Sequence, residues 1–513
     1  MKQKVWIILG TLLWIGGTSG TVALTQDAPN GQDRCARLLD TNFAALPDAP
    51  THVVSASVVP ASAELPEFCE VRGYVGSHVQ FAVRLPTQNW NGRLLLQGCG
   101  GFCGRIPIEG TNDALKRGYA VTSNDMGHQS TPRDGKWAYN NREAEIDFGY
   151  RATHVNAVAA KAIVAAHYGK PAQYSYYRGC STGGRQGLGS AQRFPEDFDG
   201  IVAGAPVIYY TGAAVQLMWC VLANLDAEGK PIVKPSQIPM IHKAASESCD
   251  GTDGLKDGII EDPRNCTFDP ASLLCKNPGD QNCLTAEQVA VVKKIYQGPV
   301  NSKGQKLHVG SAMVGSELNW VPDYIGEEGK PPVYLSFIGD LLRYMAFSED
   351  PGPSYDPRSF NFDTDPARLG AMESIYNGTN PDLRKFKARG GKIIGYHGWM
   401  DQSVIPGNYL DYYELTARAM GGMDALPSFF RLFMIPGMNH CRGGPGADTI
   451  DYLTYIEDWV EKGKAPDVMI GAHVENGVTK FTRPVFPYPD VARYTGQGDV
   501  NDAANFKRVR PTK

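Results

Sequence analysis

Residues 174–184 read Tyr-Ser-Tyr-Tyr-Arg-Gly-Cys-Ser-Thr-Gly-Gly and decide the fold class. The run Tyr174 to Arg178 has the composition of a β-strand, and Gly179-x-Ser181-x-Gly183 follows it directly before a predicted helix. Small residues are required on both sides of the serine because the turn is strained, and the strain lifts the hydroxyl above the sheet. The stretch predicts a nucleophilic serine on a strand–turn–helix unit, against the alternative of an ordinary tight turn.

Other strand and helix patterns alternate around this unit, as in an α/β fold. A helix is predicted over 153–167, with Val155, Val158, Ala159, Ala162 and Ile163 on the side that packs on a sheet. Strands are predicted at 93–97, 120–123, 201–203, 392–396 and 432–435. Strand signals are sparse over 207–388, where Pro, Gly, Asp and four cysteines from Cys249 to Cys283 gather. We therefore expect a catalytic domain in two parts, 24–206 and 389–513, interrupted by an inserted domain over 207–388.

Length and composition agree with two such units. The chain has 513 residues, 42% of them hydrophobic and 20% charged, with a formal net charge of −4. It can bury a large core and is neither disordered nor strongly polyionic, so nucleic-acid binding through a basic surface is not expected. The eleven cysteines are too few for a small disulfide scaffold and would reinforce a core that is already adequate.

The N-terminal segment 1–23 has the pattern of a secretory signal peptide. Lys2 and Lys4 precede the apolar run from Val5 to Ile15, and small residues follow up to Ala23. An uncleaved anchor is the alternative, but the run is shorter than the roughly 20 apolar residues that span a bilayer. We expect a secreted or periplasmic protein with no membrane attachment after cleavage, in a compartment that permits disulfides.

A serine nucleophile needs a base and an acid that orients the base, and in this fold class they follow in the order Ser, Asp, His. Asp401 comes just after the strand 392–396, and His440 comes just after the strand 432–435. Both stand at the carboxyl ends of strands, where open α/β sheets place ligand sites. Ser181, Asp401 and His440 are therefore the predicted catalytic residues.

Three other histidines are alternatives. His473 lies in what looks like a plain strand. His397 could line the pocket or simply end its strand, and His128 is better explained by a turn that Asn124 and Asp125 stabilise.

Stabilising the oxyanion needs backbone N–H groups that can approach it closely. The glycine-rich loop 98–104 follows an early strand, so Gly100 or Gly101, together with Thr182 after the nucleophile, is the predicted donor pair. The alternative is a loop whose glycines only permit unusual backbone angles.

Cys180-Ser181 and His440-Cys441 place a cysteine beside both the predicted nucleophile and the predicted base. In this the sequence resembles the tannase and feruloyl esterase family, in which a disulfide joins these flanking residues. The resemblance implies an α/β-hydrolase sheet with helices on both faces and a lid, formed by the insertion, over the active site. It extends over most of the predicted mature chain, through Gly98 to Gly104, Asp147 to Tyr150, Gly179 to Gly187, Ala203 to Pro206, the cysteine-rich insertion, Asp401 and His440.

The resemblance also implies a disulfide layout. It pairs Cys180 with Cys441, Cys35 with Cys69, Cys249 with Cys266, and Cys275 with Cys283. A bond between Cys180 and Cys441 would hold Ser181 and His440 within reach of each other. Cys99 and Cys103 could join, or one of them could reach Cys220, so the layout leaves one free thiol.

Within the insertion, three carboxylates and several glycines gather over 250–259. Oxygen ligands at close spacing on a turning loop suit calcium, although the spacing is not that of an EF-hand. The resemblance implies a structural Ca2+ site with side chains of Asp250, Asp253 and Asp257 and carbonyls of Leu255 and Ile259. A solvated acidic turn is the alternative. No organic cofactor is expected.

The substrate is the least determined feature. On a helix, Arg343 and Phe347 would share a face at i, i+4 spacing, with Ser348 beside them, which suits a flat aromatic acid with a polar or carboxylate group. An ordinary helix with one packed Phe and one solvated Arg explains the pattern nearly as well.

Together these features predict a secreted serine carboxylic ester hydrolase that acts on esters of aromatic, phenolic acids. A mono(2-hydroxyethyl) terephthalate-type hydrolase or an acyltransferase of the same fold is the alternative. A non-catalytic binding protein of this fold would not need all of Ser181, Asp401 and His440. The natural ester and the oligomeric state stay open.

Overall fold

The computed structural model describes residues 1–2, 31–277 and 279–511. The apolar run of the predicted signal peptide lies outside the described residues, so that prediction stays open. Within the described ranges, no helix has both the length and the apolar character needed to cross a membrane.

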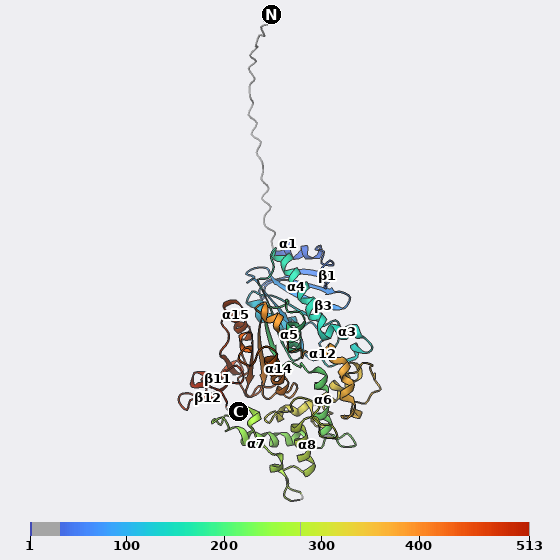
Figure 1. The fold of residues 1–513 in the computed structure, drawn as a ribbon, viewed down its shortest axis with the longest axis vertical. Helices are drawn as coiled ribbons and strands as arrows, with labels where there is room; N and C mark the ends of the chain where they lie inside the picture. The colour runs from blue at the N-terminus through green and yellow to red at the C-terminus, as the bar shows by residue number, and fades with distance from the viewer. Residues whose placement is uncertain (3–30, 278, 512–513) are drawn as a thin grey trace.

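A nine-stranded mixed sheet forms the centre of the fold (Figure 1), with the strand order β1-β2-β3-β5-β4-β6-β7-β8-β9. The strands from β5 to β9 run parallel, and β1 to β3 add an antiparallel edge. The strand predicted at 174–178 is present, and so are the five strands predicted at 93–97, 120–123, 201–203, 392–396 and 432–435. The strands are β1 (Thr51–Val59), β2 (Phe68–Val75), β3 (Val79–Pro86), β4 (Arg93–Gln97), β5 (Ala120–Asn124), β6 (Tyr174–Cys180), β7 (Gly200–Gly204), β8 (Lys392–Gly398) and β9 (Phe430–Ile435).

Helices cover both faces of the sheet, as expected. Successive strand residues point to opposite faces, and Ile201 and Val202 of β7 accordingly belong to different buried clusters. The face of Ile201 packs against α4 (Ala152–Tyr168), α5 (Thr182–Arg193) and α14 (Pro406–Ala419). The face of Val202 packs against α2 (Asn112–Lys116) and α15 (Tyr452–Lys462). The predicted helix over 153–167 is α4, which ends where Gly169 adopts a left-handed conformation.

The chain leaves the sheet after β7 and returns at β8. We call residues 205–391 the inserted segment; its described part, which omits residue 278, contributes no strand to any sheet. In Figure 1, α7 and α8 of this segment lie at the end of the molecule away from β1. Its helices are α6 (Tyr210–Ala223), α7 (Ile238–Cys249), α8 (Ala286–Gln297), α9 (Trp320–Asp323), α10 (Val333–Tyr344), α11 (Asp365–Leu369), α12 (Glu373–Tyr376) and α13 (Arg384–Ala388).

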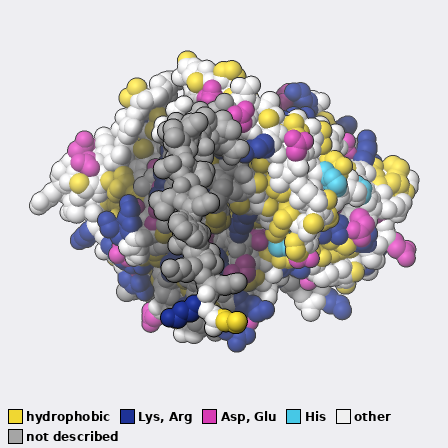
Figure 2. Space-filling model, turned by 90° about the horizontal axis from the view of Figure 1, so that it is seen from above, with side chains coloured by type: hydrophobic (Ala, Val, Ile, Leu, Met, Phe, Trp, Pro, Cys, Tyr) yellow, Lys and Arg dark blue, Asp and Glu magenta, His cyan; other side chains and the backbone are white. Residues whose placement is uncertain are grey.

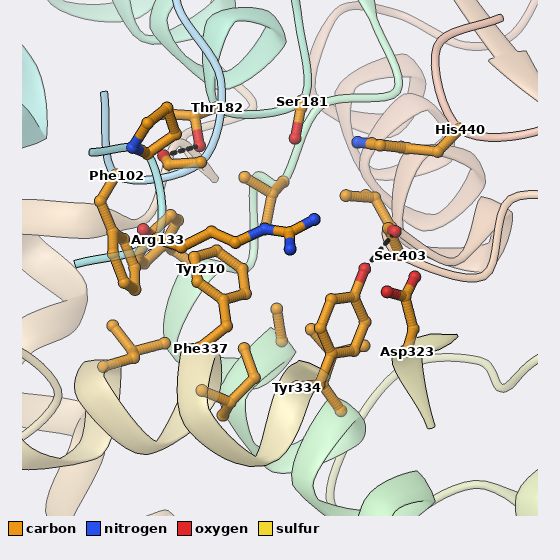
Figure 3. A pocket seen from close by; sticks show the side chains of 18 of the residues that line it. Phe102, Arg133, Ser181, Thr182, Tyr210, Asp323, Tyr334, Phe337, Ser403 and His440 are labelled. Atoms are coloured by element: carbon orange, nitrogen blue, oxygen red, sulfur yellow. Dashed lines mark hydrogen bonds between the residues drawn. The ribbon is translucent and has the colours of Figure 1, made fainter. Parts of the chain in front are cut away.

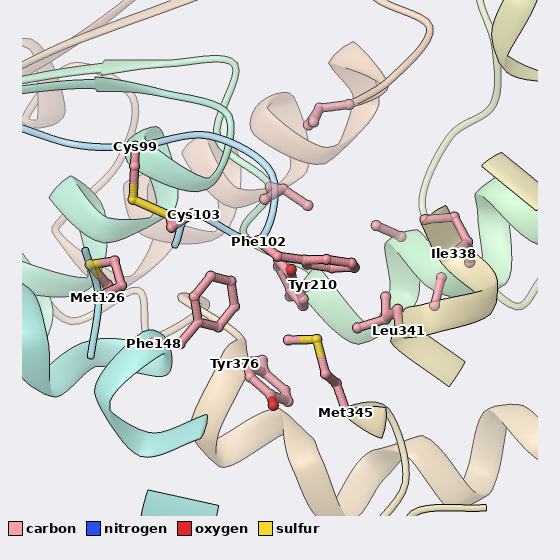
Figure 4. Close-up of a cluster of buried hydrophobic side chains, with 14 of the residues drawn as sticks. Cys99, Phe102, Cys103, Met126, Phe148, Tyr210, Ile338, Leu341, Met345 and Tyr376 are labelled. Atoms are coloured by element: carbon pink, nitrogen blue, oxygen red, sulfur yellow. A yellow bond between two sulfur atoms is a disulfide. The ribbon is translucent and has the colours of Figure 1, made fainter. Parts of the chain in front are cut away.

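The inserted segment shares a buried cluster with the loops at the edge of the sheet (Figure 4). Met126 and Phe148 pack in the same cluster as Tyr210, Leu341 and Tyr376 of the inserted segment. The two parts therefore bury their apolar surface jointly. The boundaries of a separate inserted domain stay a prediction.

The remaining elements are α3, between β5 and α4, and elements near the two ends of the described chain. Lys and Arg side chains are interspersed with Asp and Glu on the face seen in Figure 2, in keeping with the small net charge. These elements are α1 (Gly31–Ala36), α3 (Arg142–Ile146), and the hairpins β10 (Met469–Glu475) with β11 (Val478–Val485) and β12 (Val491–Tyr494) with β13 (Phe506–Val509).

Candidate active site

Ser181 occupies a sharp turn between β6 and α5. Its φ of 63° is a left-handed value that a residue with a side chain adopts only under strain. Gly179 and Gly183 permit the turn: a Cβ on Gly179 would come within 2.7 Å of the Gly183 backbone. The local sequence therefore fixes the turn that holds the Ser181 hydroxyl at the carboxyl edge of the sheet.

His440 and Asp401 reach the same edge from β9 and β8. The Nδ1 atom of His440 lies 2.7 Å from Oδ2 of Asp401. Oδ1 of Asp401 accepts hydrogen bonds from the backbone N–H groups of Ser403 (2.9 Å) and Val404 (2.8 Å). Ser181 and His440 line one cavity and point toward each other in Figure 3. The structure thus brings together the three residues that the sequence singled out.

The charges of this group favour an ionised carboxylate beside the imidazole. Burial raises the pKa of the Asp401 carboxyl, but the charge of His440 and hydrogen bonds from His397 and His440 outweigh burial and hold this pKa well below its usual range. Burial lowers the pKa of His440, but the charge and hydrogen bond of Asp401, with the charge of Asp323, raise it above its usual value. Asp401 therefore favours a proton on the imidazole.

A disulfide between Cys180 and Cys441 joins the residues that flank Ser181 and His440. The other pairs are Cys35–Cys69, Cys99–Cys103, Cys249–Cys266 and Cys275–Cys283. Of the alternatives that the sequence left open, Cys99 and Cys103 bond to each other and neither bonds to Cys220. Cys220 is the free cysteine, and it is buried.

The cavity at Ser181 has a volume of about 340 Å3 (Figure 3). Most of its wall is apolar and comes from α6, α10 and the loop after β4. The polar lining groups are few, and they include Arg133, Asp323 and Gln402. The apolar and aromatic lining residues are Phe102, Val207, Tyr210, Ala213, Leu217, Tyr334, Phe337, Ile338, Leu341 and Val404.

The glycine-rich loop lies beside Ser181, but Gly101 and not Gly100 lines the cavity. The Thr182 hydroxyl donates to the Gly101 carbonyl (2.8 Å), which holds the loop against the start of α5. Gly101 has a φ of 58°, and a Cβ there would come within 2.3 Å of the Pro132 carbonyl oxygen. Of the two glycines that the sequence left open, Gly101 lines the cavity and Gly100 does not, and Thr182 lines it as well.

The residues predicted to contact the substrate do not line this cavity. The Arg343 guanidinium donates to the Tyr355 carbonyl (3.0 Å) and pairs with Asp340 (3.3 Å), and neither Arg343 nor Phe347 nor Ser348 lines the cavity. Helix α10 ends at Tyr344, so Phe347 does not follow Arg343 by one helical turn. Phe347 is buried beneath the guanidinium of Arg368, and the Ser348 carbonyl accepts a hydrogen bond from Arg142.

Two histidines whose role the sequence left open, His397 and His128, contact residues of the site. His397 is fully buried, and its Nε2 lies 3.1 Å from Oδ2 of Asp401 and 2.7 Å from the Val404 carbonyl. His128 donates to the Phe102 carbonyl (2.8 Å), which supports a cavity-lining residue. Asn124 and Asp125 accept from the backbone of the next turn, as predicted, and His473 lies in β10.

Arg133 and Asp323 were missed because neither has a motif around it. Arg133 follows the turn after β5, and Asp323 ends the short helix α9 in the inserted segment. The packing of α9 over the sheet edge brings Asp323 to the cavity. Arg133 arrives there because the Phe102 N–H donates to the Pro132 carbonyl (2.8 Å), which joins the loops after β4 and β5.

The proposed calcium loop lies next to the Cys249–Cys266 disulfide. Asp253, Leu255, Asp257 and Ile259 line one small cavity, as oxygen ligands of a single ion would. Asp250 instead accepts from the backbone N–H groups of Asp257 (3.1 Å) and Gly258 (2.9 Å).

Two arginines face the same carboxylates. Arg483 lies 2.9 Å from Asp257 and Arg493 lies 4.0 Å from Asp253. No group of three or more His, Cys, Asp or Glu side chains in 31–277 or 279–511 is arranged to hold a metal ion. The loop offers oxygen atoms, which are the ligands that calcium prefers. The two arginines offset part of the negative charge of these carboxylates even when no ion is bound.

Comparisons with known proteins agree with this site. The sequence model of the family described as "Tannase and feruloyl esterase" matches residues 66–509. The chain is 34% identical to mono(2-hydroxyethyl) terephthalate hydrolase of Piscinibacter sakaiensis, over 89% of this chain and 87% of that protein. It is 33% identical to a probable feruloyl esterase of Arthroderma benhamiae, over 84% and 83% of the two chains.

Among solved structures, feruloyl esterase B from Aspergillus oryzae superposes with a TM-score of 0.83 at 30% identity, covering 94% of this chain and all of that one. An α/β sheet with a serine on a strand–turn–helix and a histidine–aspartate pair is typical of hydrolases that act on acyl groups. The chain belongs to the tannase and feruloyl esterase family, and it is a carboxylic ester hydrolase.

Proposed function

We propose that this protein hydrolyses esters of aromatic, phenolic acids with Ser181 as nucleophile, His440 as base and Asp401 as the group that orients His440. The observation that carries the proposal is one cavity in which Ser181 faces His440, whose Nδ1 lies 2.7 Å from the buried Asp401 carboxylate. A protein that only binds a ligand has no need of this arrangement.

The chemistry follows from the positions of these groups. His440 takes the proton of the Ser181 hydroxyl as the hydroxyl oxygen attacks the ester carbonyl. His440 then donates that proton to the leaving alcohol. Water repeats the sequence on the acyl-enzyme, with His440 again as base. The N–H groups of Thr182 and Gly101 stabilise the negative charge on the carbonyl oxygen. Thr182 begins α5, and the first N–H groups of a helix have no partner within the helix.

The cavity wall supports an aromatic acyl group. Phe102, Tyr210 and Phe337 present rings to a cavity with few polar groups, and aromatic rings stack well on a flat acid. The relatives are named for feruloyl esters and for mono(2-hydroxyethyl) terephthalate, which are both esters of aromatic acids.

The test is a substrate panel of methyl ferulate, methyl gallate and mono(2-hydroxyethyl) terephthalate, scored by kcat/KM for the wild type and for Ser181→Ala. We expect at least one ester to be hydrolysed by the wild type and the rate to fall by about 10⁴ or more in the variant. Fluorophosphonate should label the wild type and not Ser181→Ala. Turnover retained by Ser181→Ala contradicts the mechanism, and equal, negligible rates on all three esters contradict the aromatic substrate class.

We also propose export to an oxidising compartment and a lid role for the inserted segment. Five disulfides among the described residues support the first, and the cavity-lining residues of α6 and α10 support the second. Signal cleavage is tested by sequencing the N-terminus of exported protein.

Calcium in the 250–259 loop is proposed as a structural ion. Asp253, Asp257 and the carbonyls of Leu255 and Ile259 would hold it, and a bound divalent cation would stabilise the loop. Thermal unfolding in EGTA and in millimolar CaCl2 is the test. A Tm several degrees higher in calcium is expected, whereas equal Tm values would mean that Arg483 and Arg493 neutralise the loop alone.

A further inference from the structure

The loop that brings Gly101 to the cavity is closed by a disulfide of its own. Cys99 and Cys103 are bonded to each other, with 5.5 Å between their Cα atoms (Figure 4). We call residues 99–103 the disulfide ring. Gly101 lies inside this ring and lines the cavity. Its N–H donates no hydrogen bond to any described residue, so it is available to an oxyanion.

The backbone of the disulfide ring has a conformation that needs support. The φ values of Gly101 and Cys103 are 58° and 61°, and a residue with a side chain holds such a left-handed value only when its surroundings enforce it. Four of the seven residues in 98–104 are glycines, whose backbone is the least restricted of all. Without a restraint, this loop would sample many conformations in which the Gly101 N–H points away from the substrate.

Gln186 of α5 contacts the disulfide directly. Its Nε2 lies 3.3 Å from Sγ of Cys99 and 3.6 Å from Sγ of Cys103. The Cys99 N–H donates to Oε1 of the same amide (3.4 Å), so the amide presents its NH2 group to the two sulfurs. The Gln186 side chain is buried. One side chain therefore holds both ends of the disulfide ring.

The same helix carries the second oxyanion donor. Thr182 precedes Gln186 by four residues on α5, and its hydroxyl donates to the Gly101 carbonyl (2.8 Å). Helix α5 thus contacts the disulfide ring at two points, once at the sulfurs and once at Gly101. These contacts hold the N–H groups of Gly101 and Thr182 in place relative to each other.

We infer that the Cys99–Cys103 disulfide and Gln186 are positioning groups for the oxyanion donor at Gly101, and that they raise kcat without contributing to ester binding. Neither cysteine lines the cavity, nor does Gln186, so they act through Gly101 and not on the substrate. Donors that are already in place stabilise the transition state without reorganisation. This inference rests on the proposed function and adds to it the groups that hold the oxyanion loop.

The test removes the disulfide in Cys99→Ala/Cys103→Ala, which leaves no new thiol. On the ester of the panel above that is hydrolysed fastest, we expect kcat to fall about tenfold and KM to stay within about twofold. The expected loss is smaller than the roughly 10²–10³ in kcat that removal of a whole oxyanion donor costs, because the Gly101 N–H is still present.

A second measurement separates positioning of the donor from a general structural effect. The carbonyl carbon of 2,2,2-trifluoroacetophenone bonds to a serine oxygen, and the resulting tetrahedral adduct carries a negative oxygen where the oxyanion forms. Its Ki should rise by about the same factor as kcat/KM falls, since both report the transition state.

Two further variants complete the experiment, and Tm reports the folding of each. Gln186→Met keeps the volume and the disulfide but removes the amide, and it should lower kcat about threefold or more; it decides the question if Cys99→Ala/Cys103→Ala does not fold. Cys275→Ala/Cys283→Ala is the matched control. It removes another short disulfide, between cysteines 8 residues apart in the inserted segment, and should leave kcat and Ki within about twofold.

Unchanged kcat and Ki in folded Cys99→Ala/Cys103→Ala, or in Gln186→Met where the double variant does not fold, overturn the inference alone. A raised KM with unchanged kcat, or an equal loss of kcat in the control, overturns it as well. A wild type that hydrolyses no ester of the panel contradicts the proposed function and the inference with it.

Discussion

His440 is held between two carboxylates of different kinds. Asp401 bonds directly to Nδ1, while Asp323 acts across the cavity through its charge. Behind Asp401, His397 and the N–H groups of Ser403 and Val404 fix the carboxylate. The imidazole is thus oriented by Asp401 from the loop after β8, and a carboxylate of the inserted segment also raises its pKa.

The raised pKa of His440 predicts the pH dependence of hydrolysis. In the proposed mechanism His440 acts as a base only when neutral, so kcat/KM should rise with pH through this pKa, with its midpoint above the ordinary value of about 6.5. Asp401 and Asp323 are the carboxylates that raise it, and Arg133 is the cation in the same cavity. Asp323→Asn should move the midpoint to lower pH. A midpoint at or below about 6.5 in the wild type would contradict this electrostatic account.

Asp401→Asn should lower kcat by about 10⁴ while the protein remains folded. An Asn oxygen can still accept from Ser403 and Val404, which leaves the amide NH2 facing His440 and favours the wrong tautomer of the imidazole. Initial rates and thermal unfolding measure the two effects. Asp382→Asn is a matched control, because Asp382 forms an exposed ion pair with Arg384, and it should not affect kcat. A similar loss of kcat in this control would point to a general effect of the substitution.

At the scale of elements, helix α10 shows why the substrate contacts could not be read from the sequence. Its cavity residues are Tyr334, Phe337, Ile338 and Leu341, which follow each other at i, i+3, i+4 and i+7 on one face. Arg343 falls on another face. The sequence contains both stripes, and only the packing of α10 beside α6 decides which one lines the cavity.

Helix α10 therefore gives a paired prediction. Phe337→Ala should raise KM by about tenfold, because an aromatic wall of the cavity is lost. Arg343→Ala should leave kcat/KM within about twofold, since its guanidinium bonds to Tyr355 and Asp340 outside the cavity. Steady-state kinetics of both variants on one ester are the test. A large loss of kcat/KM in Arg343→Ala would support the sequence-based prediction that Arg343 contacts the substrate.

The sequence predicts the turn and the strands of the site because nearby residues determine them. Gly179 and Gly183 are needed by the turn itself, and Asp401 and His440 follow strands whose buried runs are visible in the sequence. Gly100 and Gly101 could not be separated, because which of two adjacent glycines faces the cavity depends on the contact with Pro132. Asp323 and Arg133 meet Ser181 only through long-range packing, which leaves no mark in their own neighbourhoods.

At the scale of the molecule, Arg185 ties helix α5 to the rest of the fold. It is 2% exposed and donates to the carbonyls of Gly149 (2.9 Å), Tyr376 (2.9 Å) and Phe148 (3.2 Å). Its guanidinium also lies over the rings of Phe148 and Tyr210. One side chain on α5 thus satisfies backbone groups of both the sheet loops and the inserted segment.

Arg185→Met should destabilise the protein by about 3 kcal/mol or more, because buried carbonyls of Phe148, Gly149 and Tyr376 lose their donor. The measurement is Tm, with a fall of several degrees expected. Arg193→Met is the matched control on the same helix, where the side chain is exposed and little change should follow. Equal shifts in both variants would refute the special role of Arg185.

The Cys180–Cys441 disulfide has a consequence for biosynthesis. Its partners are 261 residues apart in the sequence, and a ribosome that adds roughly 5–20 residues per second needs on the order of 13–50 s to make the second cysteine after the first. During that interval Cys180 is able to pair with thiols made earlier, such as Cys99 and Cys103. Production of active enzyme should therefore depend on a disulfide isomerase in the host and fall in a cytosol with reducing thiols.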